Sequence, residues 1–168
     1  EAIAQSVGKL TEQVENVLDL SQSEAGLMPL NKRPLDLMAL LSKIVRQREG
    51  RILDAGLTLN LRGDAGRQLE ADAAQLQRAF AHLLDNAIAA TPPNGRIAIE
   101  IKPLAEATRV TIADSGAGMT QAELARALEG LRTTTDGVAM ERRQGLGLPL
   151  ARRLIDAHGG TLELASRK

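Results

Sequence analysis

The chain has 168 residues, of which 43% are hydrophobic and 25% are charged, which is the composition of an ordinary globular domain with a short appendage. Its 21 Lys and Arg balance 21 Asp and Glu, so the formal net charge is zero, which argues against broad electrostatic binding to nucleic acid. Cysteine is absent, which excludes disulfides, thiolate metal sites and cysteine nucleophiles, and no apolar run of roughly 18 residues is present to span a bilayer.

The first segment is predicted to be one helix from Glu1 to about Ala25. Its apolar residues follow alternating steps of four and three, a narrow seam suited to pairing with another helix. They are Ile3, Val7, Leu10, Val14 and Val17. We therefore expect a dimer or a helix bundle, with an amphipathic helix lying on its own domain as the alternative. Residues 1–27 form this region, and residues 28–35, which include Pro29 and Pro34, are predicted to be a linker.

Residues 36–168 are predicted to form a second domain, which opens with a helix from Asp36 to about Ala55. Gly56 ends this helix. The residues Leu57–Leu61 alternate between apolar and polar like a strand, and Gln68–Ala71 is predicted to be another short strand. The expected buried face of the helix consists of Leu37, Leu40, Leu41, Ile44, Val45, Ile52 and Leu53.

The next predicted element is a helix over Ala73–Ala90, with Asp72 as its N-cap. Two strands, Ile97–Ile101 and Arg109–Ile112, are expected to follow. The expected core stripe of this helix is Leu76, Phe80, Leu83, Leu84, Ala87 and Ile88.

The C-terminal part is predicted to contain two more helices and a closing strand. One helix covers Gln121–Leu128, and the other runs from near Leu148 to the double glycine at residues 159–160. The polar stretch Leu131–Gln144 between them is predicted to be a loop, and Thr161–Leu164 a strand. Long helices with several short, mostly antiparallel strands indicate an α+β fold, a two-layer sandwich in which helices cover one face of a sheet.

Three short segments contain residues suited to binding a ligand. On the Ala73–Ala90 helix, His82 and Asn86 lie one turn apart, and an Asn oxygen is a suitable ligand for Mg²⁺. An Asn on a helix is also often simply solvated, and this alternative stays open.

The other two segments are rich in glycine. In Asp114-Ser115-Gly116-Ala117-Gly118 the glycines allow close backbone approach to a ligand, and the carboxylate can accept a hydrogen bond from an exocyclic amine, although such a sequence can be only a turn. Gly145-Leu146-Gly147-Leu148 opens a helix whose N-terminus suits phosphate. It fits neither the dinucleotide-binding fingerprint nor the P-loop.

In this order the three segments resemble the ATP-binding domain of sensor histidine kinases, within the GHKL superfamily of Bergerat-fold ATPases. Residues 83–87 resemble the N box, residues 114–119 the first glycine box, and residues 145–148 the second. Residues 17–26 are similar to the end of the second dimerisation helix of these kinases. The resemblance therefore implies that residues 1–27 are part of the dimerisation and phosphotransfer region and residues 36–168 the catalytic ATP-binding domain, with the family's last strand beyond Lys168.

The resemblance also implies roles for individual residues. Asn86 would hold Mg²⁺, and Asp114 would recognise the adenine amino group. Glycines in both boxes would let the backbone approach ATP. The full set of implied nucleotide contacts is Asn86, Asp114, Gly116, Gly118, Met119, Gly145, Leu146, Gly147 and Leu148. Residues 131–144 would form the ATP lid.

The implied reaction is transfer of the γ-phosphoryl group of ATP to a histidine outside this sequence, for relay to a response regulator. The implied partners are that regulator and a second copy of the chain, paired through the N-terminal helix. The implied location is cytoplasmic, whether or not a full-length protein is anchored in a membrane.

The two histidines within the ATP-binding part need separate interpretations. His82 lies where hydrolytic ATPases of the superfamily carry a glutamate base, so it is a candidate to position water or polarise a phosphate. The alternative, which we favour, is a hydrogen-bonding residue at the edge of the site. His158 is predicted to have a structural role at the end of its helix. Neither is expected to accept the phosphoryl group.

The sequence departs from the family at several positions. Ala89 and Ala90 stand where the family often has a basic and an aromatic residue, and residues 128–131 hold leucines in place of the usual lid phenylalanines. Arg143 or Gln144 replaces the first glycine of the second box, and Arg142 and Arg143 are candidates to supply the missing charge. A degenerate kinase that acts as a protein-interaction module is therefore an alternative, and a hydrolytic ATPase is a third interpretation that fits less well.

Overall fold

The computed structural model describes residues 30–64, 68–129 and 147–166. The chain divides into two compact units, residues 1–30 and residues 31–168, and the fold below is that of the second. The predicted helix at residues 1–27, the lid at 131–144 and the glycine-box residues Gly145 and Leu146 lie outside the described part. Every helix among the described residues is too short or too polar to span a bilayer.

The second unit begins with a strand that the sequence did not predict. Strand β1 (Arg33–Asp36) lies in the stretch expected to be a linker, and it pairs antiparallel with β3 (Gln68–Ala71), which was predicted. Asp36, at the end of β1, accepts a hydrogen bond at Oδ1 from the Ala39 N–H and so caps the next helix. The partner of β1 lies about 35 residues away in the chain, so local patterning could not reveal the pairing.

The single helix expected from Asp36 to Ala55 is in fact two helices, α2 (Leu37–Gln47) and α3 (Glu49–Asp54). The backbone leaves helical geometry at Arg48, where φ is −110° and ψ is 2°. The break changes which side chains face the core. Leu53, expected to be buried, is 68% exposed, whereas Ile52 is buried.

Helix α4 (Ala73–Ala90) has the predicted bounds and the predicted cap. Asp72 Oδ1 accepts hydrogen bonds from the N–H groups of Ala74 and Gln75, at 3.0 and 3.1 Å. The predicted core stripe of α4 is buried except for Leu83, which is half-buried. Together with α2 and the sheet, α4 encloses the main hydrophobic core.

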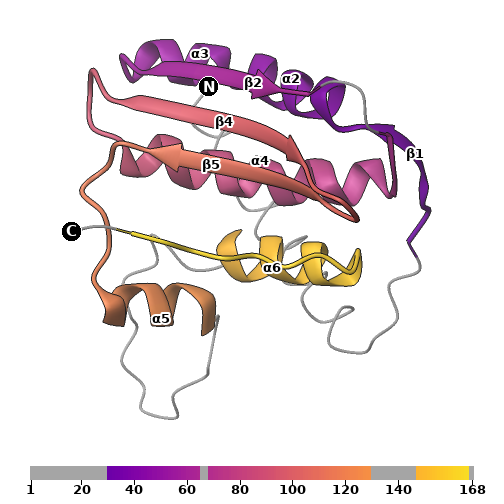
Figure 1. The fold of residues 1–168 in the computed structure, drawn as a ribbon. Coiled ribbons are helices and arrows are strands. Elements are labelled where there is room, and N and C mark those ends of the chain that lie inside the picture. The colour runs from indigo at the N-terminus through magenta and orange to yellow at the C-terminus, as the bar shows by residue number, and fades with distance from the viewer. Residues whose placement is uncertain (1–29, 65–67, 130–146, 167–168) are drawn as a thin grey trace, which may run out of the picture. The chain divides into compact units, whose positions relative to one another are not determined.

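The main sheet has the order β2 (Thr58–Gly63), β4 (Arg96–Pro103) and β5 (Thr108–Asp114). β4 and β5 are antiparallel as expected, but β2 and β4 are parallel, because the intervening chain crosses back through α4. Alternate residues of β4 point into the core and are almost fully buried, namely Ile97, Ile99 and Ile101. Helices α2 and α4 lie behind this sheet in Figure 1, which confirms the two-layer α+β sandwich.

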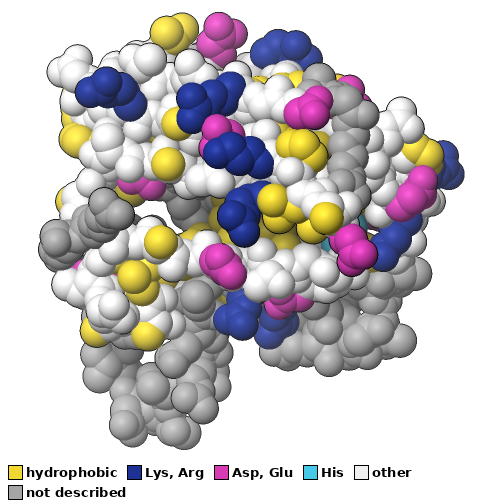
Figure 2. Space-filling model, viewed as in Figure 1, with side chains coloured by type: hydrophobic (Ala, Val, Ile, Leu, Met, Phe, Trp, Pro, Cys, Tyr) yellow, Lys and Arg dark blue, Asp and Glu magenta, His cyan; other side chains and the backbone are white. Residues whose placement is uncertain are grey.

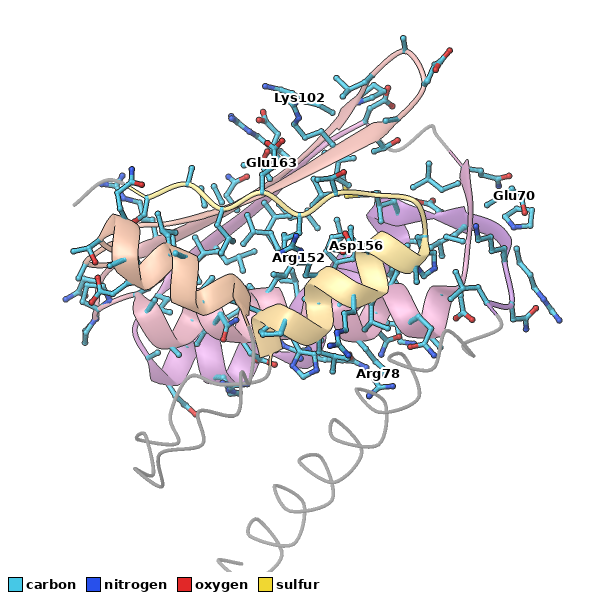
Figure 3. The ribbon with its side chains drawn as sticks, turned by 90° about the horizontal axis from the view of Figure 1, so that it is seen from below. Glu70, Arg78, Lys102, Arg152, Asp156 and Glu163 are labelled. Atoms are coloured by element: carbon cyan, nitrogen blue, oxygen red, sulfur yellow. The ribbon has the colours of Figure 1, made fainter. Side chains whose placement is uncertain are left out.

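The opposite face of the sheet is polar, and charged side chains gather on this side of the molecule (Figure 2). Glu100 on β4 forms ion pairs at 3.0 Å with Arg62 on β2 and with Lys102. The Lys102 ammonium and the Arg62 guanidinium lower the pKa of the Glu100 carboxyl. In Figure 3, Lys102 lies on the sheet, whereas Arg152 and Asp156 lie on α6 beneath it.

Helices α5 (Gln121–Glu129) and α6 (Gly147–Ala157) complete the described elements close to their predicted bounds. Leu150, Ala151 and Leu154 are the buried face of α6, which packs against α4. The prediction of a closing strand at Thr161–Leu164 is wrong, because these residues pair with none of the described strands. Apolar and polar residues do alternate there, but alternation alone does not provide a neighbouring strand to pair with.

A hydrogen-bonded junction joins the start of α4 to the end of α6 and to the start of the unit. Asp72 Oδ2 accepts from the Asn31 N–H at 3.0 Å, and the Asp72 N–H donates to His158 Nε2 at 3.1 Å. Because Nε2 accepts, Nδ1 carries the proton and donates to the Leu154 carbonyl at 2.7 Å. His158 thus has the structural role predicted for it. Burial raises the pKa of the Asp72 carboxyl, but its backbone N–H donors outweigh burial and hold the pKa below its ordinary value of 3.8.

We predict that Asp72→Ala lowers the free energy of unfolding by about 1 kcal/mol at neutral pH, the usual cost of a lost N-cap. The folded-state pKa of Asp72 is lowered, so its stabilisation is complete above the unfolded value near 3.8 and is lost as pH falls through the folded value. Urea denaturation over a pH series should therefore show the gap between the two proteins closing in acid. Asp54→Ala, at an exposed position on α3, is the control and should change stability by less than about 0.5 kcal/mol. A gap that widens in acid would contradict this account of the junction.

Candidate functional site

The first and third predicted segments meet where α4 passes the start of α6. His82 and Asn86 are half-buried on α4, and Gly147 is the first residue of α6. A Cβ at Gly147 would lie 3.5 Å from His82 Nδ1 and 3.7 Å from Asn86 Nδ2. The structure thus brings the amide of Asn86 and the imidazole of His82 beside the N-terminus of a helix, where backbone N–H groups and the helix dipole favour negative charge.

The second predicted segment meets the C-terminal end of the same helix. Asp114 ends β5, and its Oδ1 accepts a hydrogen bond from the Gly116 N–H at 2.9 Å. Gly116 packs so closely against α4 that a Cβ there would lie 2.5 Å from the Ala90 carbonyl oxygen. Gly118 has a φ of 72°, a conformation that favours glycine. The segment is therefore a tight turn that only small residues can form against α4.

One face of α4 therefore joins all three segments. His82, Asn86 and Ala90 are spaced four residues apart, so they lie along one side of the helix at intervals of about 6 Å. Gly147 faces the first two positions, and Gly116 packs against the third. Residues that are some 60 positions apart in the sequence thus lie along the same side of α4.

The remaining residues predicted for nucleotide contact are only partly described. Met119 is half-buried, and its N–H donates to Ser166 Oγ at 2.7 Å, which ties the turn to the C-terminal segment. Leu148 is half-buried in the first turn of α6. Arg142 and Arg143 lie outside the described residues, as do Gly145 and Leu146.

Sequence reasoning missed the residue that fixes the rotation of α4. Asp85, next to Asn86, forms a two-pronged ion pair with Arg48, with distances of 2.9 Å from Nε and 2.8 Å from a terminal nitrogen. Arg51 on α3 pairs with the same carboxylate. Asp85 and Arg48 are 37 residues apart, and neither stands out in its own segment, so only the fold reveals their pairing. The pair holds Asp85 toward α2 and α3.

The oxygen donors of this region suit a hard cation that is held mainly by the phosphates of a bound nucleotide. Among residues 30–64, 68–129 and 147–166, no group of three or more His, Cys, Asp or Glu side chains could hold a metal ion by itself. The half-buried amide of Asn86, beside the start of α6, is a single protein oxygen donor. Mg²⁺ is commonly held by one or two protein groups together with substrate phosphates, so these residues fit Mg²⁺ that arrives with a nucleotide.

Comparison with known proteins gives one consistent family. Residues 71–168 match the family described as histidine kinase-, DNA gyrase B-, and HSP90-like ATPase. The chain is 32% identical, over 98% of its length, to the circadian input-output histidine kinase CikA of Synechococcus elongatus, and it covers 22% of that protein. The chain spans about a fifth to a third of the length of the curated relatives it matches.

Two solved structures resemble this fold closely. Full-length ShkA in complex with AMPPNP has a TM-score of 0.79 at 25% identity, over 94% of this chain and 33% of that one. Histidine kinase ThkA in complex with response regulator protein TrrA has a TM-score of 0.71 at 22% identity, over 94% of this chain and 43% of that one.

We predict that Gly116→Ala and Gly147→Ala differ sharply in stability. A Cβ at Gly116 would overlap the Ala90 carbonyl and Asp114 Oδ1, at 2.5 and 2.7 Å, so the backbone must move, at a cost of about 1–3 kcal/mol. A Cβ at Gly147 meets only ordinary contacts, so this variant should stay within about 0.5 kcal/mol of the wild type. Urea denaturation of both variants measures the difference. Equal losses would contradict the close packing of the Asp114 turn on α4.

Proposed function

We propose that this chain, which belongs to the family of histidine kinase-, DNA gyrase B- and HSP90-like ATPases, is the ATP-binding part of a two-component sensor kinase and binds Mg-ATP along one face of α4. The observation that carries the proposal is the meeting of Gly147 with Asn86 and of the Asp114 turn with Ala90. That surface offers an acidic group at one end and a helix N-terminus at the other. A nucleotide needs both, because its base presents an amine and its phosphates are anionic.

The adenine end of the site is the Asp114 turn. The Gly116 N–H fixes the orientation of the Asp114 carboxylate, and a carboxylate has lone pairs to accept further hydrogen bonds. The exocyclic amine of adenine is a donor, so Asp114 can recognise it. Gly116, which packs on the Ala90 carbonyl, and Gly118, which has a positive φ, keep the turn compact enough to lie beside the base. Met119 follows directly and is half-buried beside this turn.

The phosphate end of the site is the start of α6. The first turn of a helix carries backbone N–H groups without an intrahelical partner, which suit phosphate oxygens, and Gly147 places no side chain between this turn and α4. The amide oxygen of Asn86 would hold the magnesium ion. A magnesium ion held there would supply the positive charge that offsets the charge of the phosphates. We assign His82 a hydrogen-bonding role at this edge of the site. Gly145, Leu146 and Leu148 are proposed to complete the loop around the phosphates.

The proposed reaction transfers the γ-phosphoryl group of ATP to a histidine nitrogen outside this chain, with ADP as the leaving group. CikA is named a histidine kinase, and ThkA was solved with a response regulator, which supports a relay to such a regulator. His158 is unsuited to accept the group, because both of its ring nitrogens are hydrogen-bonded in the junction with Asp72 and Leu154. Pairing of two copies through residues 1–27 would bring the acceptor of a full-length protein to the site.

A second candidate is a degenerate kinase that acts as a protein-interaction module. It is favoured by Ala89 and Ala90, which are both exposed and supply neither the charge nor the aromatic ring that the family often places there. It is disfavoured by Asn86 and Asp114, which keep the groups needed for metal and adenine. Autophosphorylation of a full-length protein at the usual rate would exclude the second candidate.

We predict that Asn86→Ala and Asp114→Asn each weaken Mg-ATP binding at least about tenfold, measured by titration calorimetry. Removing Mg²⁺ with a chelator should weaken binding to the wild type, and it should have little further effect on Asn86→Ala, which has already lost the protein ligand. Asn60→Ala on the exposed outer face of β2 is the matched control and should bind like the wild type. Absence of binding to the wild type at millimolar Mg-ATP, or full affinity in both site variants, would refute the proposal.

A further inference from the structure

An open cavity of about 480 Å³ lies between the C-terminal end of α4 and the Asp114 turn. This volume is in the range that accommodates small organic groups. Side chains from both sides form its walls, and most of them are small and apolar. The lining residues are Ala89, Ala90, Thr91, Pro92, Pro93, Ser115, Gly116 and Ala117.

The two hydroxyls of these walls, on Thr91 and Ser115, already form hydrogen bonds within the protein, and so does the Gly116 N–H. The Thr91 hydroxyl donates to the Ala87 carbonyl at 2.6 Å, and Ser115 Oγ accepts from the Arg96 N–H at 2.8 Å. The Gly116 N–H donates to Asp114. What the cavity offers a ligand is therefore mainly the methyl groups of three alanines and the rings of two prolines. Such a surface favours an apolar group over a charged or strongly polar one.

The cavity adjoins the group that we propose to recognise adenine. Gly116 forms part of its wall, and a Cβ on that residue would be within 2.7 Å of both Asp114 Oδ1 and the Ala90 carbonyl oxygen. If the amine of a purine donates to Asp114, the edge of the purine that carries the amine faces the Asp114 turn. This turn also forms one wall of the cavity. A group attached to that edge would enter the cavity.

We propose that this site accepts adenine nucleotides with an apolar substituent on the exocyclic amine, and that Ala89 and Ala90 determine this tolerance. The inference rests on the proposed ATP site. A singly substituted amine keeps one N–H, so it can still donate to Asp114, while the substituent occupies the space between Ala90 and Ala117. A large side chain at residue 90 would fill that space and restrict the site to unsubstituted adenine.

The test compares Mg-ATP with Mg-N6-benzyl-ATP by titration calorimetry on the 168-residue chain. We expect the wild type to bind the benzyl analogue within about threefold of ATP or more tightly. Ala90→Phe should shift the ratio of the two dissociation constants at least about tenfold toward ATP. Ala98→Phe, the same change on the exposed outer face of β4, is the matched control and should leave the ratio unchanged. Ala117→Leu fills the cavity from its other wall and should shift the ratio in the same direction as Ala90→Phe.

The possible results distinguish failure of this inference from failure of the proposed ATP-binding function. If the wild type binds ATP but binds the analogue more than about tenfold more weakly, the inference is wrong and the ATP site stands. If the analogue binds well but neither Ala90→Phe nor Ala117→Leu shifts the ratio, the substituent lies elsewhere and the inference also fails. If neither nucleotide binds the wild type, the proposed function itself fails. Thermal melting of each variant shows whether it is folded. If either Ala90→Phe or Ala117→Leu fails to fold, the other variant still tests the inference.

Discussion

The position of α4 is the constraint on which the rest of the structure depends. Its start is fixed by Asp72, which accepts from three backbone N–H groups and donates its own N–H to His158 at the end of α6. Its rotation is fixed near Asn86 by the pair between Asp85 and Arg48. Its end is fixed by close packing of Gly116 on the Ala90 carbonyl. A helix held at three points along its length presents the same face to the rest of the site in every molecule.

The chemistry of that face of α4 depends on small residues as much as on polar ones. Glycine at residue 116 lets the Asp114 turn pack on the Ala90 carbonyl, which no larger residue would allow, and glycine at residue 147 places no side chain against His82 and Asn86. Alanine at residues 89 and 90 leaves an open space lined by methyl groups beside an acidic turn. The same small residues that remove ordinary family features from this chain therefore leave a largely apolar surface beside the proposed adenine end of the site.

Features that depend on local chemistry could be predicted from the sequence. The Asp72 cap and the bounds of α4 follow from one capping residue and one apolar stripe, and β3 follows from alternation. Features that depend on distant partners could not. β1 exists because β3 pairs with it, and Arg48, at the break between α2 and α3, pairs with Asp85, 37 residues away. Thr161–Leu164 alternates like a strand but has no ladder partner. Each of the three motifs could be recognised in the sequence, but only the structure shows that they meet on α4.

The most direct test of the account is a crystal structure of the chain with magnesium and a non-hydrolysable ATP analogue. The account predicts that the adenine amine lies within hydrogen-bond distance of the Asp114 carboxylate and that the Asn86 amide oxygen is a ligand of the metal. It also predicts that the phosphates lie against the start of α6. A nucleotide bound away from this face of α4, or a metal held without Asn86, would contradict it.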